Sequence, residues 1–187
     1  GCPTLEGTAS VIKAMQAHGI DMIEVGIPFS DPLADGPVIQ SAGTMALKNG
    51  MTLSHLFNQL QSIKNEVHIP LMGYLNVIMH FGIEAFCQRC VEVGVSGAII
   101  PDLPFADYLE VVKPVADRYD LRIIMMITPE TSEERIRFID EHTDGFIYMV
   151  SSASITGAQS SFGDAKLEYF SRINAMNLRN PRMIGFG

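Results

Sequence analysis

The sequence lacks the features that identify membrane proteins and nucleic-acid-binding proteins. No apolar run reaches the roughly 18 residues that span a bilayer, and the chain does not open with a basic segment followed by an apolar one. Acidic residues outnumber basic ones, 21 to 13, and the basic residues do not cluster. A groove that follows a phosphate backbone needs clustered Lys and Arg. We therefore expect neither a membrane nor a nucleic acid as a partner.

Cysteine and histidine are also sparse. Three cysteines are too few, and odd in number, for a disulfide framework, which favours a reducing cytoplasm as the compartment. Cys87 and Cys90 have a C-x-x-C spacing, but they lie on the apolar face of an amphipathic stretch, so two buried small side chains explain them better than a redox or zinc site. The five histidines are scattered singly without metal-ligand spacing. No metal is expected.

What the sequence contains is a repeated alternation of two kinds of apolar segment. Amphipathic stretches of helical period, such as residues 53–63 and 83–91, separate short runs rich in β-branched residues. Thr131-Ser132-Glu133-Glu134 precedes a further helix as a capping-box pattern. The short runs are typical of strands that are buried on both faces, and they cover residues 20–26, 69–74, 97–101, 121–128, 145–151 and 182–187.

Strands separated by a helix length each time indicate parallel pairing through right-handed crossovers. Two α/β architectures satisfy this order, an open doubly wound sheet and a (β/α)8 TIM barrel. A dinucleotide-binding open sheet needs G-x-G-x-x-G after a strand, and the sequence has none. Polar, glycine-rich loops follow nearly every strand instead. The sequence therefore favours the barrel.

The number of strands is smaller than a barrel requires. The sequence contains six candidate strands, whereas a barrel has eight. Gly1-Cys2-Pro3 is typical of a loop just after a strand, and Gly187 falls within or just after one. We expect residues 1–187 to form a single barrel domain that lacks its first strand and its last βα unit. Such a chain would have two open sheet edges and would fold poorly alone.

Glu24 is the first candidate for a catalytic residue. Alternation along residues 20–26 places Met22, Glu24 and Gly26 on one face and Ile23 and Val25 on the other. A carboxylate on the inner face, near the C-terminal end of a strand, lies where barrel active sites form. Apolar surroundings should raise its pKa and allow proton exchange near neutral pH. The alternative is a structural glutamate in a salt bridge.

The loop after this strand, Pro28-Phe29-Ser30-Asp31-Pro32-Leu33-Ala34-Asp35-Gly36-Pro37, supplies a second carboxylate. Taken alone, Asp35 is better explained as a helix N-cap, with Pro37 near the first helical position. Taken together, Glu24 and Asp35 indicate acid–base chemistry on one substrate.

A glycine-bearing loop at residues 151–163 is the third candidate. It has many hydroxyls but no Lys or Arg, and backbone N–H groups near Gly157, Gly185 and Gly187 can cradle a phosphate. A surface loop without function explains its composition equally well. No lysine falls at the C-terminal end of a strand, which argues against a Schiff-base mechanism.

The run Ile23-Glu24-Val25-Gly26-Ile27-Pro28-Phe29-Ser30-Asp31-Pro32-Leu33-Ala34-Asp35-Gly36-Pro37 resembles the tryptophan synthase alpha subunit family. The resemblance continues through Gly73-Tyr74-Leu75-Asn76, Pro101-Asp102-Leu103-Pro104, Thr128–Arg135, Ile155-Thr156-Gly157 and Gly185-Phe186-Gly187. The resemblance implies a (β/α)8 lyase that cleaves indole-3-glycerol phosphate to indole and glyceraldehyde 3-phosphate in tryptophan biosynthesis, without a metal or organic cofactor.

The resemblance also implies roles for single residues. Glu24 would protonate indole C3 and then take the proton of the glycerol hydroxyl, and Asp35 would hold the indole N–H. Tyr148 would line the indole pocket. Phosphate and ring would be bound by the substrate-binding residues Thr156, Gly157, Phe186 and Gly187.

The same resemblance implies a partner. The family forms an αββα assembly with a beta subunit, which holds pyridoxal phosphate, so this chain needs no cofactor of its own. The residues that match the partner-facing loops are Pro28, Asp31, Asn76 and Pro104. Ser152 and Ser154 depart from the pattern of the family in the residue 151–163 loop. Two alternatives to a fully active lyase are a mainly allosteric subunit with weak turnover of its own, and another phosphosugar lyase or isomerase on the same barrel.

Overall fold

A computed structural model describes residues 1–64, 66–151 and 164–185. It confirms the alternation of helices and strands. The N-terminal half contains α1 (Gly7–Ala17), β1 (Val25–Gly26), α2 (Pro37–Lys48), α3 (Leu53–Gln61), β2 (Pro70–Met72), α4 (Leu75–Phe81), α5 (Ile83–Glu92) and β3 (Gly97–Ile99). The C-terminal half contains α6 (Phe105–Asp107), the π-helix η1 (Tyr108–Val112), α7 (Lys113–Arg118), β4 (Arg122–Ile127), α8 (Glu133–His142), β5 (Ile147–Val150), α9 (Asp164–Ala175) and β6 (Arg182–Gly185).

The strands of the described residues form one parallel sheet whose spatial order is β1-β2-β3-β4-β5-β6, the same as their order in the chain. Each crossover therefore moves to the next strand in the same direction. A doubly wound sheet reverses this direction at its switch point, whereas a barrel does not. The order thus confirms the (β/α)8 class, and the residues that the structure describes form a six-stranded part of the barrel wall.

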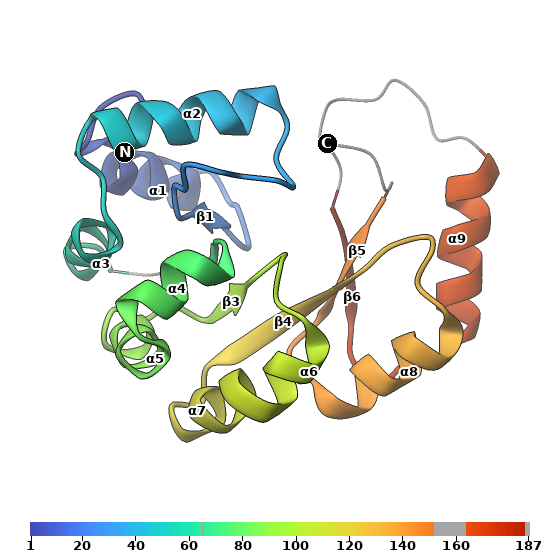
Figure 1. Cartoon of the computed structure of the whole chain (residues 1–187). Coiled ribbons are helices and arrows are strands. Elements are labelled where there is room, and N and C mark those ends of the chain that lie inside the picture. Colours follow the sequence, from blue (N-terminus) through green and yellow to red (C-terminus); the bar gives the residue numbers. More distant parts are fainter. Residues whose placement is uncertain (65, 152–163, 186–187) are drawn as a thin grey trace.

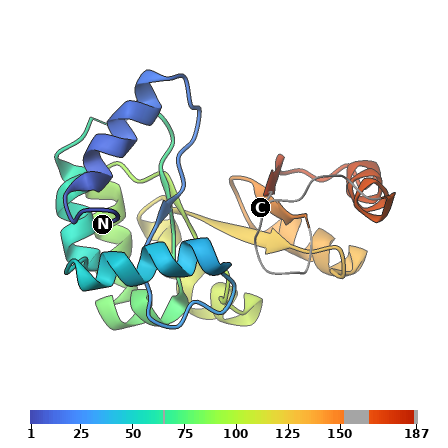
Figure 2. The ribbon, with the colours of Figure 1, turned by 90° about the horizontal axis from the view of Figure 1, so that it is seen from above.

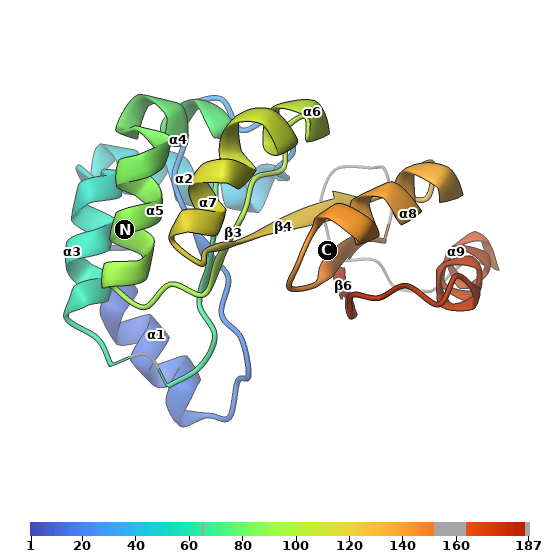
Figure 3. The ribbon, with the colours of Figure 1, turned by 90° about the horizontal axis from the view of Figure 1, so that it is seen from below.

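The helices lie along the outside of this curved wall (Figure 1). Neighbours in the row contact one another, α1 with α3, α3 with α5, and α5 with α7. Seen from above, the N-terminal helices lie on one side of the molecule, while α8 and α9 lie at its other end (Figure 2). From below, β3 and β4 run between these two groups (Figure 3).

The sheet buries apolar side chains on both of its faces, as the β-branched runs predict. The outer face packs against the helices in the larger core, which includes Leu71, Ile123 and Ile147. A second cluster fills the inner face, where barrel strands stack their side chains in layers. It consists of Ile99, Ile124 and Phe146, with Met22, Met72, Met126 and Tyr148 packed against them.

Helix ends follow the chemistry of the sequence. Gly19, Gly50 and Gly94 have positive φ angles of 78°, 90° and 72° just after α1, α2 and α5, a conformation that glycine adopts without steric cost. Ser132 caps α8, because its side chain accepts a hydrogen bond of 3.2 Å from the Arg135 N–H. Cys87 and Cys90 are buried in α5 and are not disulfide-bonded.

None of the helices in the ranges described is long and apolar enough to cross a membrane.

Candidate active site

Glu24 directly precedes β1 and lies on the inner face of the sheet. The Ile23, Val25 and Ile27 side chains are buried under the helices, whereas Glu24 lies on the opposite face of the strand. Backbone hydrogen bonds from Ile23 N–H to the His68 oxygen (2.9 Å) and from Ile27 N–H to the Met72 oxygen (2.7 Å) extend the pairing with β2 on both sides of the short strand. The alternation that the sequence predicts is therefore present, and Glu24 points into the barrel.

The surroundings of Glu24 favour its protonated form. The carboxyl retains contact with solvent, yet desolvation raises the pKa of Glu24 above its usual value. This is the direction that its apolar surroundings predict. A carboxyl with a raised pKa can donate a proton in one step and accept one in the next.

Asp35 is not the N-cap of α2. The cap position is Gly36, no side chain caps the helix, and Pro37 occupies the first turn. The Asp35 carboxylate instead accepts a hydrogen bond of 2.9 Å from the Tyr74 hydroxyl, while the Asp35 carbonyl oxygen accepts one of 2.8 Å from Gln40 Nε2. Glycine can serve as a cap without a side-chain bond, which leaves the carboxylate available for the pocket.

Tyr74 is a site residue to which the sequence analysis assigned no role. It follows the end of β2, its side chain is 6% exposed, and its ring packs against Phe29 with the centroids 5.3 Å apart. The signal was present in the sequence, because a polar residue directly after a buried strand lies at the carboxyl end of the barrel.

Tyr148 of β5 is half-buried and lies near Glu24. Burial and the charge of the Glu24 carboxylate raise the pKa of the Tyr148 hydroxyl. Its ring lies against the backbone of Gly185, where an added Cβ would be 2.6 Å from the ring carbon Cζ. A side chain at position 185 would therefore displace the ring of Tyr148.

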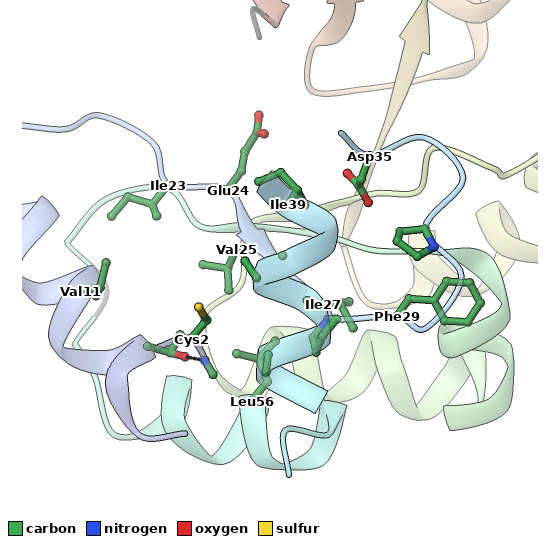
Figure 4. Close-up of a pocket in the computed structure, with 18 of the residues that line it drawn as sticks. Cys2, Val11, Ile23, Glu24, Val25, Ile27, Phe29, Asp35, Ile39 and Leu56 are labelled. Carbon is green, nitrogen blue, oxygen red and sulfur yellow. Dashed lines mark hydrogen bonds between the residues drawn. The ribbon is translucent and has the colours of Figure 1, made fainter. Parts of the chain in front are cut away.

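Glu24, Asp35, Tyr74 and Tyr148 line one cavity of about 680 Å³. That is the size of a typical small-molecule site, and most of its lining is apolar. Glu24 and Asp35 lie toward one end of the pocket, and Cys2 and Leu56 lie toward the other (Figure 4). The structure thus brings the two carboxylates and Tyr148 to the same pocket.

The partner-facing residues named from the sequence lie on loops and at one helix start after three adjacent strands. Pro28 and Asp31 follow β1, Asn76 is the second residue of α4 after β2, and Pro104 follows β3. Asp31, Asn76 and Pro104 are exposed, and Pro28 is partly so. The other substrate-binding residues named from the sequence lie outside the described residues, and these are Thr156, Gly157, Phe186 and Gly187. Ser152 and Ser154 lie outside them as well.

The ranges that the structure describes contain no group of three or more His, Cys, Asp or Glu side chains placed to hold a metal ion. Two carboxyl groups in one largely apolar pocket suit proton transfer to and from a small molecule. Fold and site together define a (β/α)8 protein with two carboxyl groups in one apolar pocket.

Comparison with known proteins gives the family. The family model of the tryptophan synthase alpha chain matches residues 1–187. The tryptophan synthase alpha chain of Phocaeicola vulgatus is 68% identical over 100% of this chain and 73% of its own length. That of Parabacteroides distasonis is 67% identical, over 100% of this chain and 74% of its own length. The chain belongs to the tryptophan synthase alpha chain family.

Solved structures agree with the sequence comparison. Tryptophan synthase subunit alpha from Legionella pneumophila superposes with a TM-score of 0.88 at 36% identity, over 100% of this chain and 69% of that one. A chain in the tryptophan synthase complex from Pyrococcus furiosus has a TM-score of 0.85 at 31% identity, over 97% of this chain and 72% of that one.

Membership of this family establishes the activity. The alpha chain is a lyase that cleaves indole-3-glycerol phosphate in tryptophan biosynthesis. It carries no cofactor, since pyridoxal phosphate belongs to the beta subunit, with which the family forms complexes.

Proposed function

We propose that Glu24 and Asp35 perform the proton transfers of this cleavage. The observation that carries the proposal is that both carboxylates line the same apolar cavity, with the pKa of Glu24 raised by desolvation. In this assignment Glu24 protonates indole C3 while Asp35 takes the N–H proton. The bond between C3 and the glycerol carbon then breaks as Glu24 removes the hydroxyl proton of that carbon. The bonding pair returns to the ring, Asp35 returns its proton to nitrogen, and indole and the aldehyde leave.

Tyr148 is proposed to line the indole pocket beside Glu24, which its position against Gly185 supports. The phosphate is proposed to bind backbone N–H groups at Gly157 and Gly187, with Thr156 and Phe186 beside the substrate. This part of the proposal rests on the family motifs that these residues match.

The beta subunit is proposed to dock on Pro28, Asp31, Asn76 and Pro104. These residues follow the carboxyl ends of β1, β2 and β3, which are neighbours in the sheet, so they belong to one side of the molecule. The same side carries Asp35, so docking can influence the loop of the acid–base site. A reducing cytoplasm is the proposed compartment, and the three free cysteines support it.

The test of the acid–base assignment is Glu24→Gln in the full chain, assayed for indole release in the presence of beta subunit. General acid–base catalysis contributes about 10²- to 10⁴-fold, so we expect the rate to fall by about that factor. Glu141→Gln, an exposed glutamate of α8, is the matched control and should keep the wild-type rate. Indole release by Glu24→Gln within a few-fold of wild type would refute the role of Glu24.

A further inference from the structure

The Tyr74 hydroxyl has two hydrogen-bond partners, and both belong to the loop between β1 and α2. It accepts a bond of 2.8 Å from the Ala34 N–H and donates one of 2.9 Å to Asp35 Oδ2. Because the N–H of Ala34 occupies the acceptor side of the hydroxyl, the proton of Tyr74 is directed at the carboxylate. One side chain from the end of β2 therefore orients both the backbone and the carboxyl group of a loop that starts at β1.

Tyr74 is itself held from two directions. Its ring packs against Phe29 in the same loop, with the ring planes at 33°. The next residue, Leu75, donates its N–H to Asp102 Oδ1 at 2.8 Å, and Asp102 follows β3. Hydrogen bonds thus connect the carboxyl ends of three adjacent strands to the Asp35 carboxylate. A rigid support of this kind is what a catalytic group needs to keep its geometry.

The proton stays on the tyrosine throughout the working pH range. Burial raises the pKa of Tyr74 to about 12, and the hydrogen bond to Asp35 and the charges of Asp35 and Asp102 act in the same direction, against the hydrogen bond from Ala34. The hydroxyl is therefore a permanent donor to Asp35 at neutral pH.

We propose that Tyr74 is the positioning residue of Asp35, a role that rests on the proposed function of Asp35 in taking the substrate N–H proton. The bond orients the carboxylate so that its other lone pairs face the pocket. Its contribution is greatest when charge develops on the substrate nitrogen, because a misdirected carboxylate stabilises that charge less well. The effect should therefore appear in kcat rather than in KM.

The experiment is Tyr74→Phe in the full chain with beta subunit, with indole release from indole-3-glycerol phosphate as the readout. A hydrogen bond to a charged group corresponds to roughly a 10- to 100-fold change, so we expect kcat to fall by about that factor while KM changes less than about threefold. Tyr119→Phe is the matched control, since the Tyr119 hydroxyl donates to the Glu84 carboxylate at 3.2 Å and neither residue lines the pocket. It should leave kcat unchanged.

A double-mutant cycle with Asp35→Ala separates positioning from a general structural effect. If Tyr74 acts through Asp35, Tyr74→Phe should cost less than about twofold once the carboxylate has been removed. Multiplicative losses in the double variant, or a wild-type kcat in Tyr74→Phe alone, would overturn the inference. Full activity in Asp35→Ala would instead overturn the proposed function of Asp35, so the two failures are distinguishable.

Phe29→Leu supplies a second readout that keeps the hydroxyl. It loosens the ring of Tyr74 without removing its hydrogen bonds. We expect a smaller fall in kcat, again only while Asp35 is present. An equal fall in kcat with and without Asp35 would count against the inference.

Discussion

The Glu24 side chain is exposed to solvent, yet partial desolvation makes its ionised form less favourable than it is in water. Desolvation raises the pKa of Glu24, so the protonated form is favoured in the folded chain more than in the unfolded one. The favourable contribution of the protonated form is complete below the unfolded-state pKa and is lost as the pH rises through the higher folded-state pKa. Ionisation of Glu24 is therefore less favourable in the folded chain than in the unfolded one, and the proposed mechanism starts from the protonated form.

This penalty leads to an expectation about stability. Glu24→Gln removes the charge and keeps the shape, so the variant should have a higher free energy of unfolding than wild type at pH 7, and the difference should vanish near pH 4. Urea unfolding at the two pH values measures it. A variant that is less stable than wild type at pH 7 would show that the charge is not penalised, contrary to the account.

The sequence predicted the position of Glu24 correctly but not the hydrogen-bond partner of Asp35. The position of Glu24 on the inner face followed from strand alternation, a local rule. The N-cap alternative for Asp35 was wrong because Gly36 occupies the cap and Tyr74, 39 residues away, binds the carboxylate. A hydrogen bond between two strand ends leaves no periodic pattern in the sequence, so it could not be predicted from spacing.

At the scale of elements, the strands were predictable and their limits were less so. All six apolar runs contain strands, but β1 has two residues and β3 three, because pairing ends where the chain leaves the sheet for the loops. The π-helix η1 between α6 and α7 gave no sequence signal, because its hydrogen-bond register differs from that of an α-helix while its apolar spacing does not.

The Asp140 carboxylate of α8 binds the segment before β6, together with the backbone oxygens of Asp140 and Thr143. Asp140 Oδ2 accepts a bond of 2.7 Å from the Arg179 N–H, and Oδ1 accepts bonds of 2.8 and 2.9 Å from the Asn180 N–H and Nδ2. Burial opposes the charge, but these hydrogen bonds and the charge of Arg179 outweigh it and lower the pKa of Asp140. The ionised side chain thus fixes the start of the strand that carries Gly185.

Asp140→Asn should therefore destabilise the chain. The variant places an amide N–H against backbone donors, and we expect a loss of about 2–3 kcal/mol at pH 7. Because the folded-state pKa is lowered, the wild-type advantage is present above the unfolded-state pKa and should decline as the pH falls through the folded-state pKa. Urea unfolding at pH 7 and pH 3 measures both effects.

Asp117→Asn is the matched control for Asp140→Asn. Asp117 is exposed and pairs with Lys113 one helical turn away at 3.0 Å, so its loss should cost less than about 0.5 kcal/mol. Equal losses in the two variants would contradict the importance of the buried network.

At the scale of the whole molecule, the sequence predicted the architecture because each βα unit carries the same pattern. Two facts chose the barrel over the open sheet, namely the missing dinucleotide motif and the polar loops after the strands, and the one-directional strand order confirms that choice. Strand order itself could not be derived from periodicity, since both architectures bury their strands on two faces.

Association with the beta subunit is a property of the whole molecule, and the variant Asn76→Arg tests it. Asn76→Arg places a charge and a longer side chain in the proposed docking surface, and we expect the dissociation constant for beta subunit to rise at least tenfold. His80→Arg, at the exposed other end of the same α4 helix, should bind as wild type does. Isothermal titration measures both, and unchanged binding by Asn76→Arg would remove this residue from the interface.

Chemical rescue shows whether the Glu24 carboxyl group itself moves the protons of the cleavage. Glu24→Ala leaves space in the pocket where the carboxyl group stood, so indole release in the presence of beta subunit should fall by about 10²- to 10⁴-fold and should rise again, with saturation, on addition of formate. Chloride at the same ionic strength should restore nothing. A Glu24→Ala variant that releases indole at the wild-type rate, or that formate stimulates no more than chloride does, would show that another group moves the protons.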